Sequence, residues 1–323
     1  MKTILVTAIG SFSADIVIKS LKQMGMRVIG CDIYPKEWVA DAHNVHAFYQ
    51  VSYASRTKEY LDAIIQICHK EKVEMIFPLT DVEVDVFNSN RDIFLNDNII
   101  VCMSSKDTID ICRDKYALFR YITNNVGIVK TIPTIYLNDD KKFLPEVFPV
   151  VCKPYNGRSS QGLNYIRNME EWNVFVGEHD INSFIVQPFV EGTIVTVDVV
   201  FSPKEGKGIA IPRKELLRTL NGAGTSVYVF HDEILEKKCC MLAKKLEIIG
   251  CVNFEFILDK NGEYHFVECN PRFSGGVEFS NIAGYNCISN HLNVFLGKSI
   301  QKFEMFQNYY IARKYEEYVM KME

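Results

Sequence analysis

The chain has 323 residues, of which 48% are apolar and 24% charged, with a formal net charge of -4 at pH 7. This composition excludes a disordered chain. The slightly acidic balance, with dispersed basic residues, lacks the electrostatic footprint of proteins that bind nucleic acid or anionic membranes. The length predicts roughly two or three domains with clefts between them. We therefore expect a small-molecule protein.

The ten cysteines are dispersed, and no two of them form a Cys-x-x-Cys pair. Most lie in apolar runs, so we expect reduced, buried thiols and a cytoplasmic protein. The apolar N-terminal run is interrupted at Gly10 and Ser11, before the core of a signal peptide is complete. No apolar segment approaches the roughly 18 residues of a membrane span, so no membrane partner is expected.

Residues 1 to about 105 alternate short apolar strands with amphipathic helices. We expect strands at 3–9, 27–31, 74–78 and 99–103 and helices at 14–24 and 57–70. Alternation of this kind predicts a parallel, doubly wound, Rossmann-like sheet.

Two places in this first part could bind a ligand. Gly10 is the only glycine where a dinucleotide fingerprint needs three, and Asp32 is a common strand ending, which disfavours an NAD-dependent oxidoreductase. Asp81 and Glu83 follow a strand at the sheet edge where α/β folds bind ligands. However, Thr80 and Glu83 also have the spacing of a capping box that simply begins a helix. Both interpretations of this second motif stay open.

Beyond about residue 127 the pattern changes to paired apolar strands. We expect strands at 148–153, 164–167, 184–187, 193–201, 251–258 and 264–269, and a helix over 234–249 that Gly250 ends. The change to hairpins marks a domain boundary near residue 110. The charged, aromatic segment after Gln301 is expected to be a helix or a surface segment.

The most informative motif is Asn261-Gly262 between two apolar runs, a strong hairpin signal because both turn positions need a positive φ. A two-residue turn places Glu255 opposite Glu268. One face of the hairpin would then carry Asn253, Glu255, Glu268 and Asn270, and the other Phe254, Phe256, Val267 and Cys269.

Two facing carboxylates with Cβ atoms roughly 5 Å apart repel each other unless something compensates. Mg²⁺ does so, because it accepts carboxylate and amide oxygens together with substrate phosphates. A solvated hairpin face whose acids rest in water is the alternative. Arg272 follows Asn270 closely and favours the metal site, since a guanidinium can clamp a phosphate or carboxylate beside the same face.

Lys153 ends a buried apolar strand, where a lysine is costly unless it meets an anion. The loop that follows has two serines flanked by Gly157 and Gly162. Such a loop offers backbone N–H groups to phosphates, or it is only a flexible hairpin loop. Further on, the strand 184–187 runs into a turn whose backbone groups can read the edge of a base.

In this order, these motifs resemble the ATP-grasp superfamily, in the form of the carbamoyl-phosphate synthase large subunit. The matching segments are Asp114-Lys115, Pro149-Val-Val-Cys-Lys-Pro, the Gly/Ser loop, Val186-Gln-Pro-Phe-Val-Glu-Gly and Val267-Glu-Cys-Asn-Pro-Arg. The resemblance implies a Rossmann-like domain over 1–110, a small lid subdomain of the ATP-grasp fold over 111–190, and a C-terminal subdomain with the metal site over 191–323.

The resemblance also implies roles for single residues. ATP phosphates would be held by Lys115, Lys153 and the loop residues Gly157, Ser159, Ser160 and Gly162. The adenine would be held by Gln187, Pro188, Phe189 and Val190. Mg²⁺, with two ions expected and Mn²⁺ as an alternative, would be bound by Glu255, Glu268 and Asn270. The transferred phosphoryl group would be stabilised by Lys153, Arg213 and Arg272.

The implied reaction is ATP-dependent ligation of a small-molecule carboxylate to an amine through an acyl phosphate, in a protein that forms a homodimer. One departure is Ile194, where the family usually has a ribose-binding glutamate. Ile194 is the only sequence argument for the alternative, a non-catalytic ATP-binding module of the same fold. The substrate would lie between Asp81, Glu83 and the loop 221–226.

Overall fold

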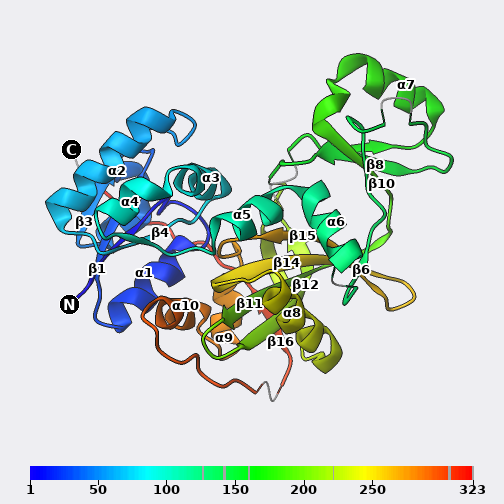
Figure 1. Cartoon of the computed structure of the whole chain (residues 1–323). Coiled ribbons are helices and arrows are strands. Elements are labelled where there is room, and N and C mark those ends of the chain that lie inside the picture. The colour runs from blue at the N-terminus through cyan, green and yellow to red at the C-terminus, as the bar shows by residue number, and fades with distance from the viewer. Residues whose placement is uncertain (126, 141–142, 159–160, 221, 305–306, 322–323) are drawn as a thin grey trace.

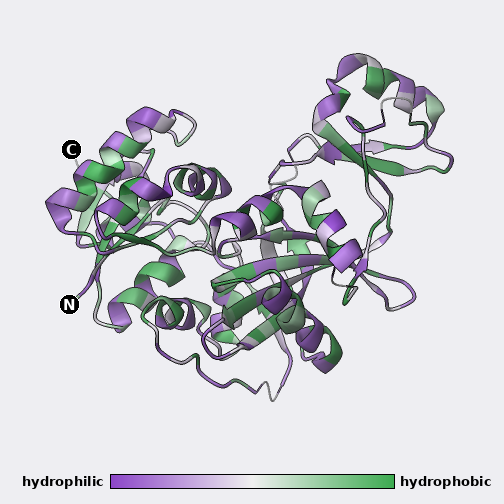
Figure 2. Cartoon of the chain, viewed as in Figure 1, coloured by the Kyte–Doolittle hydropathy of each residue, from purple (hydrophilic) through white to green (hydrophobic). Residues whose placement is uncertain are grey.

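The computed structural model describes residues 1–321 apart from 126, 141–142, 159–160, 221 and 305–306. The described residues form three sheets with helices packed on them (Figure 1). Figure 2 shows that the helices alternate hydrophilic and hydrophobic residues, as expected for elements that bury one face.

The first sheet is parallel, with the strand order β3-β2-β1-β4-β5. Its strands are β1 (Thr3–Val6), β2 (Arg27–Asp32), β3 (Ala47–Gln50), β4 (Met75–Phe77) and β5 (Ile100–Val101). One hydrophobic core joins it to α2 (Thr57–Glu71), α3 (Asp81–Ser89) and α4 (Arg91–Asn96), and another to α1 (Ala14–Gln23). The predicted Rossmann-like sheet is confirmed. The sequence pattern did not show β3, which follows short 3-10 turns at Lys36–Trp38 and Ala40–His43.

Asp32, at the end of β2, is buried and holds the turn after β1. Its carboxylate accepts hydrogen bonds from the backbone N–H groups of Gly10 at 2.7 Å and Tyr34 at 3.1 Å. The residue that a dinucleotide fingerprint would use is therefore engaged by the backbone.

The second sheet is antiparallel and has the strand order β7-β10-β8-β9. Its strands are β7 (Ile135–Tyr136), β8 (Val150–Pro154), β9 (Asn164–Ile166) and β10 (Phe184–Pro188). With α7 (Met169–Glu178) and a 3-10 turn at Ile181–Ser183 they enclose a core of their own. Figure 1 shows this part projecting away from the other two sheets.

The third sheet has seven strands in the order β16-β13-β12-β11-β14-β15-β6. In chain order they are β6 (Lys130–Thr131), β11 (Gly192–Ser202), β12 (Lys207–Arg218), β13 (Gly224–Val229), β14 (Gly250–Asp259), β15 (Tyr264–Asn270) and β16 (Tyr309–Ala312). One core joins it to α5 (Lys106–Arg113), α6 (Lys115–Asn125) and α8 (Glu233–Lys245). The resemblance placed residues from 111 onward in the lid. In the structure, α6 packs on this third sheet and β6 belongs to it, before the chain enters the second sheet.

Helices α9 (Val277–Ile282) and α10 (Cys287–Phe295) join the third sheet to the first. They share a core with α1 and β4, in which the rings of Phe77 and Phe273 lie 6.2 Å apart between centroids. This core brings the beginning of α3 next to the end of β15.

Three expectations differ from the structure. Helix α8 ends at Lys245, because Glu247 takes a left-handed conformation with φ of 54°. The segment after Gln301 contains a strand, β16, which pairs with β13. Strands β12 and β13 were not expected, since the inward positions of β12 include charged Arg213 and Glu215 instead of apolar residues.

The ten cysteines are unpaired and nine of them are buried, as expected for reduced thiols. No helix within the described residues is both long and apolar enough to cross a membrane.

Candidate active site

The hairpin of β14 and β15 brings two carboxylates face to face. Glu255 pairs with Glu268, and Asn253 pairs with Asn270, as the sequence predicted. The predicted two-residue turn is wrong, however, because the Asp259 N–H bonds the Glu263 carbonyl at 3.0 Å and leaves a three-residue loop. The ladder also shifts by one residue between Glu255 and Phe256.

The longer loop and the one-residue shift of the ladder cancel each other. Phe256 pairs with Phe266, so Val267 is the extra residue of a β-bulge that compensates for the longer loop. The bulge also changes where Val267 lies. We expected it on the face of Phe254, but it lines a cavity together with Glu268. The predicted facing of the acids is therefore correct, while the predicted turn and the side of Val267 are not.

The two acids have different electrostatic surroundings. Burial, followed by the charge of Glu268, raises the pKa of Glu255 to about 7. Burial also opposes ionisation of Glu268, but Lys115 and Lys153 outweigh it and lower its pKa. The Lys115 Nζ lies 3.3 Å from the Glu268 carboxylate. The pair thus combines one acid whose pKa is lowered with one whose pKa is raised to about 7.

Asn270 completes an oxygen-rich donor set at this point. Its Nδ2 donates to the Glu268 carboxylate at 3.1 Å and to the Asn253 Oδ1 at 3.2 Å. Among the described residues, none donates a hydrogen bond to the Asn270 Oδ1. Two facing carboxylates and an amide oxygen fit a hard divalent cation such as Mg²⁺, which takes oxygen ligands.

A first cavity, of about 420 Å³, lies between the second sheet and the β14–β15 hairpin. Its apolar wall includes Ile132, Val151, Leu163, Ile194, Ile257 and Val267. Lys115 and Lys153 also line it, and burial lowers the pKa of Lys153 to about 8. The cavity thus offers an apolar slot that ends at two lysines and two acids.

The loop after β8 is tied to this cavity by Lys115. The Lys115 Nζ donates to the Gly157 carbonyl at 2.6 Å. Gly162 has φ of 70°, and a Cβ there would come within 2.9 Å of the Pro154 ring, so a side chain is excluded. The predicted residues Ser159 and Ser160 lie outside the described part of the chain.

The segment from Gln187 to Val190 lines the same cavity. The Gln187 side chain donates to the Thr134 hydroxyl at 2.7 Å. The backbone N–H of Phe189 is taken by the Pro149 carbonyl, while that of Val190 has no partner among the described residues. Of the four residues named for the adenine, Val190 therefore has the N–H best placed to donate to a ligand.

A second cavity, of about 430 Å³, is more polar and adjoins the first. Four segments line it in part, namely residues 11–13, 80–82, 222–224 and 272–276. Four residues line both cavities, namely Arg158, Arg218, Glu255 and Glu268. The two facing acids therefore stand at the junction between an apolar cavity and a polar one.

The first-domain residues named for the substrate separate into two roles. Asp81 lines the second cavity. Glu83 does not; it accepts the Thr80 N–H at 3.1 Å and the Tyr60 hydroxyl at 3.0 Å, which is the predicted capping box. Glu83 therefore stabilises the beginning of α3 and does not line the cavity.

The two predicted arginines also differ. Arg272 lines the second cavity and donates to Asp81 at 2.7 Å. Arg213 is only 2% exposed and donates to Asp198 at 2.6 Å, to Glu215 at 3.1 Å and to the Ser274 hydroxyl at 3.0 Å. Burial opposes the charge of both, but their acidic partners raise the pKa of each. Arg213 lines the cavity, but three protein groups already hold its guanidinium.

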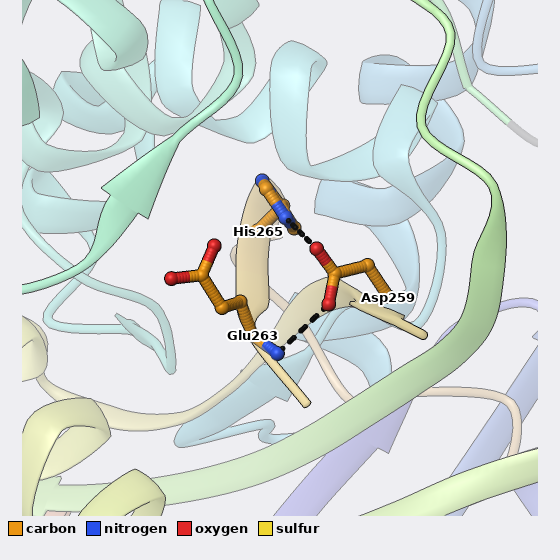
Figure 3. A group of neighbouring side chains, drawn as sticks. All are labelled: Asp259, Glu263 and His265. Carbon is orange, nitrogen blue, oxygen red and sulfur yellow. Dashed lines mark hydrogen bonds and ion pairs between the residues drawn. The ribbon is translucent and has the colours of Figure 1, made fainter. Parts of the chain in front are cut away.

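A separate acidic group lies at the tip of the hairpin (Figure 3). Asp259 accepts the backbone N–H groups of Asn261 and Glu263 at 2.9 Å each and contacts His265 Nε2 at 3.0 Å. Glu263 in turn pairs with Lys130. The bond from His265 and the backbone bonds lower the pKa of Asp259 to about 2. These contacts stabilise the turn, so we interpret the group as a structural cluster of the hairpin.

Comparisons with known proteins agree with this geometry. Residues 4–102 match a family model described as "PylC-like, N-terminal domain", and residues 180–317 match one described as "ATP-grasp in the biosynthetic pathway with Ter operon". The carbamoyl phosphate synthase large chain of Clostridium acetobutylicum is 23% identical over 263 residues. Residues 180–317 therefore belong to an ATP-grasp domain. The alignment with the synthase covers 75% of this chain but only 24% of that relative, so the chain spans about a quarter of the relative's length.

Solved structures show the same ATP-grasp fold. Biotin carboxylase of Campylobacter jejuni has a TM-score of 0.78 at 20% identity, covering 93% of this chain and 72% of that one. The N5-carboxyaminoimidazole ribonucleotide synthetase of Thermotoga maritima has a TM-score of 0.69 at 17% identity, covering 95% and 79%. The biotin carboxylase domain of the Hydrogenobacter thermophilus 2-oxoglutarate carboxylase has a TM-score of 0.74 at 18% identity, covering 93% and 71%.

Sequence reasoning missed three arginines around this ATP-grasp site. Arg218 ends β12, with its Nη2 3.7 Å from the Glu255 carboxylate and its Nε bonded to the Gly222 carbonyl. Arg158 lines both cavities, and Arg113 precedes the Asp114-Lys115 motif. Of the three, only Arg113 could have been found from the sequence, because it directly precedes the Asp114-Lys115 motif. Arg218 could not be placed while β12 was unrecognised.

Proposed function

We propose that this chain is an ATP-dependent ligase that activates a carboxylate as an acyl phosphate and joins it to an amine, releasing ADP and phosphate. The observation that carries the proposal is the position of Glu255 and Glu268, which line both the apolar cavity and the polar one. A nucleotide in the first cavity would direct its phosphates toward these acids. An acid in the second cavity would then meet the γ-phosphate at the junction.

The proposed nucleotide site follows the lining of the first cavity. The base would lie against the segment from Gln187 to Val190, and the phosphates would meet Lys115, Lys153 and the loop from Gly157 to Gly162. Ile194 lines this cavity where a glutamate would contact a ribose. We therefore propose that the ribose hydroxyls contribute little to binding here.

Glu255, Glu268 and Asn270 would hold Mg²⁺, with two ions expected and Mn²⁺ able to replace them. Bound there, the metal would neutralise charge on the transferred phosphoryl group. Arg272 would orient the acid and stabilise the charge that develops on it, and Lys153 would contact the same phosphoryl group. Arg213 would act mainly by fixing Glu215 at the cavity wall, because three protein groups already hold its guanidinium.

In the proposed reaction, a carboxylate oxygen of the acid attacks the γ-phosphorus of ATP, and the bond to the ADP oxygen breaks. The amine nitrogen then attacks the acyl carbon, loses a proton and displaces inorganic phosphate. The residues contribute positioning and electrostatics, as is general in phosphoryl transfer. We propose that ATP lies between the second sheet and the third, and that the first domain closes the second cavity.

A screen of ADP release tests this function. Purified protein with Mg²⁺ and ATP should release ADP only with a matching acid and amine from a broad panel that includes amino acids. Glu268→Ala should abolish this release while the far-ultraviolet circular dichroism stays unchanged. If the wild-type protein binds ATP but releases no ADP with any pair, the non-catalytic module, which Ile194 favours, becomes the better account.

We also propose a homodimer. The Hydrogenobacter thermophilus relative is described as a biotin carboxylase domain dimer. Light scattering of this chain at micromolar concentration tests the proposal, and a mass near 37.1 kDa would contradict it.

A further inference from the structure

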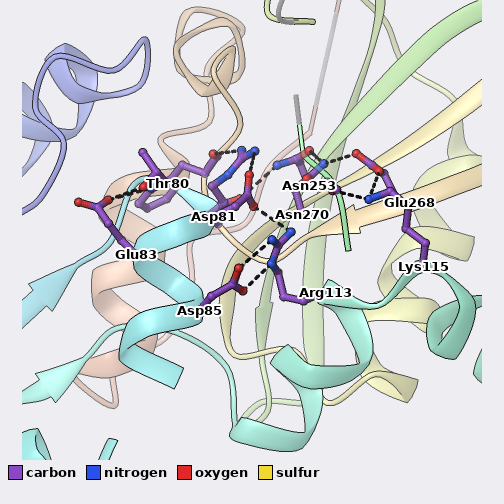
Figure 4. A network of polar contacts seen from close by, with 12 residues as sticks. Thr80, Asp81, Glu83, Asp85, Arg113, Lys115, Asn253, Glu268 and Asn270 are labelled. Atoms are coloured by element: carbon purple, nitrogen blue, oxygen red, sulfur yellow. Dashed lines mark hydrogen bonds and ion pairs between the residues drawn. The ribbon is translucent and has the colours of Figure 1, made fainter. Parts of the chain in front are cut away.

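Asp81 lies between two arginines that come from different parts of the chain, and Figure 4 labels one of them, Arg113. Its Oδ2 accepts a hydrogen bond from Arg272 Nη2 at 2.7 Å, and its Oδ1 lies 3.5 Å from Arg113 Nη1. The side chain is 3% exposed. Burial opposes its charge, but Arg272 and Arg113 prevail and lower the pKa of Asp81. One buried, ionised carboxylate of the first domain thus contacts two guanidinium groups.

The position of Asp81 is fixed by its neighbours. It is the first residue of α3, whose beginning is set by the capping box between Thr80 and Glu83. Arg113 is anchored on its other side by Asp85, with two hydrogen bonds of 2.7 and 2.9 Å (Figure 4). A carboxylate held in this way presents a preorganised partner to Arg272.

Arg272 has competing partners nearby. Its Nη1 donates to the Phe273 carbonyl at 3.0 Å, and it lines the second cavity together with Glu255 and Glu268. Both acids attract the same guanidinium. An arginine that paired with either of them would occupy an oxygen that a divalent cation needs.

We propose that Asp81 is a positioning residue that holds Arg272 away from Glu255 and Glu268, so that the two acids stay free for a divalent cation. This inference rests on the proposed function, because it takes these acids as the metal ligands. Without the charge of Asp81, Arg272 turns toward them and competes with the cation. The effect passes through Arg272, so it disappears when Arg272 is removed.

Mn²⁺ binding, measured by electron paramagnetic resonance without nucleotide or substrate, tests this inference. Asp81→Asn should weaken Mn²⁺ binding about tenfold, as expected when a group that orients a ligand set is lost. Adding Arg272→Met should restore the affinity to within about twofold of the Arg272→Met single variant, although ADP release stays low. Asp92→Asn is the control, since it removes an exposed acid of the neighbouring helix α4 and should change the affinity by less than about twofold.

Two results would overturn the inference: unchanged Mn²⁺ affinity in Asp81→Asn, or an affinity that stays low in the double variant. Removing one partner of a buried ion pair is costly, so Asp81→Asn alone can fail to fold. If Asp81→Asn does not fold, the double variant can still be compared with Arg272→Met. A weaker Mn²⁺ affinity of the double variant in that comparison also overturns the inference. Absence of Mn²⁺ binding in the wild-type protein contradicts the metal site of the proposed function instead.

Discussion

Glu255 lies directly across the β14–β15 ladder from Glu268, and Lys115 and Lys153 lower the pKa of Glu268. Burial and the charge of Glu268 make Glu255 the harder of the two to ionise. A cation that binds between them removes this repulsion. The pair therefore links metal binding, pH and stability in ways that can be measured separately.

Metal affinity should depend on pH through Glu255. Its pKa is raised to about 7, and only the ionised carboxylate is a good ligand. We expect Mn²⁺ affinity to increase from about pH 6 to about pH 8 and then to level off. Glu255→Gln should bind Mn²⁺ more weakly and lose most of this dependence. A flat profile for the wild-type protein, measured by titration calorimetry, would contradict the assignment.

The stability of the metal-free protein should change in the opposite direction. A carboxyl whose folded pKa is raised stabilises the fold at low pH, and this contribution is lost as the pH rises through about 7. Glu255→Gln should therefore raise the thermal midpoint at pH 8 by roughly 2–4 °C, and by less at pH 5. Glu37→Gln, which removes an exposed acid of the first domain, is the control. Equal gains at both pH values would disprove the effect.

Lys115 should couple the loop to the metal site. Its ammonium contacts both the Gly157 carbonyl and the Glu268 carboxylate. Lys115→Met should weaken binding of ATP with Mg²⁺ about tenfold, because one charge-assisted contact to phosphate is lost. Lys106→Met removes an exposed lysine of the preceding helix and should have no effect. Calorimetry that found the same ATP affinity in both variants would remove Lys115 from the site.

Ile194 should make the protein tolerant of changes to the ribose. Since an isoleucine cannot accept hydrogen bonds from hydroxyls, ATP and 2′-deoxyATP should bind the wild-type protein with similar affinity. Ile194→Glu should favour ATP over 2′-deoxyATP by about threefold to tenfold, which corresponds to one hydrogen bond. Strong discrimination by the wild-type protein would show that another residue reads the ribose.

The parts of the molecule differ in how well the sequence predicted them. The first sheet follows from local periodicity, which depends only on neighbouring residues. The facing of Glu255 and Glu268 was predicted correctly because the longer loop and the bulge at Val267 cancel each other. The β-bulge at Val267 could not be seen, because it compensates for a turn whose length was also mispredicted. Strand β12 was hidden, since its inward positions include Arg213 and Glu215, which pair with each other and, for Arg213, with Asp198 of the adjacent strand.

The contact between Asp81 and Arg272 was also beyond sequence reasoning. These residues are 191 positions apart, and only the shared core of α1, α9 and α10 brings their elements together. Asp81 could be named as a sheet-edge residue, but its partner depends on how the domains pack. Tertiary packing, not local pattern, decides such contacts.

The central claim is that the γ-phosphate of ATP passes to a carboxylate at the junction of the two cavities. The most direct measurement follows the oxygen atoms, using an acid from the screen labelled with ¹⁸O in its carboxylate and a matching amine. Direct transfer predicts one ¹⁸O atom in each phosphate released, detected by mass spectrometry. Phosphate that carries no label from the acid, and instead takes its new oxygen from water, would contradict the account.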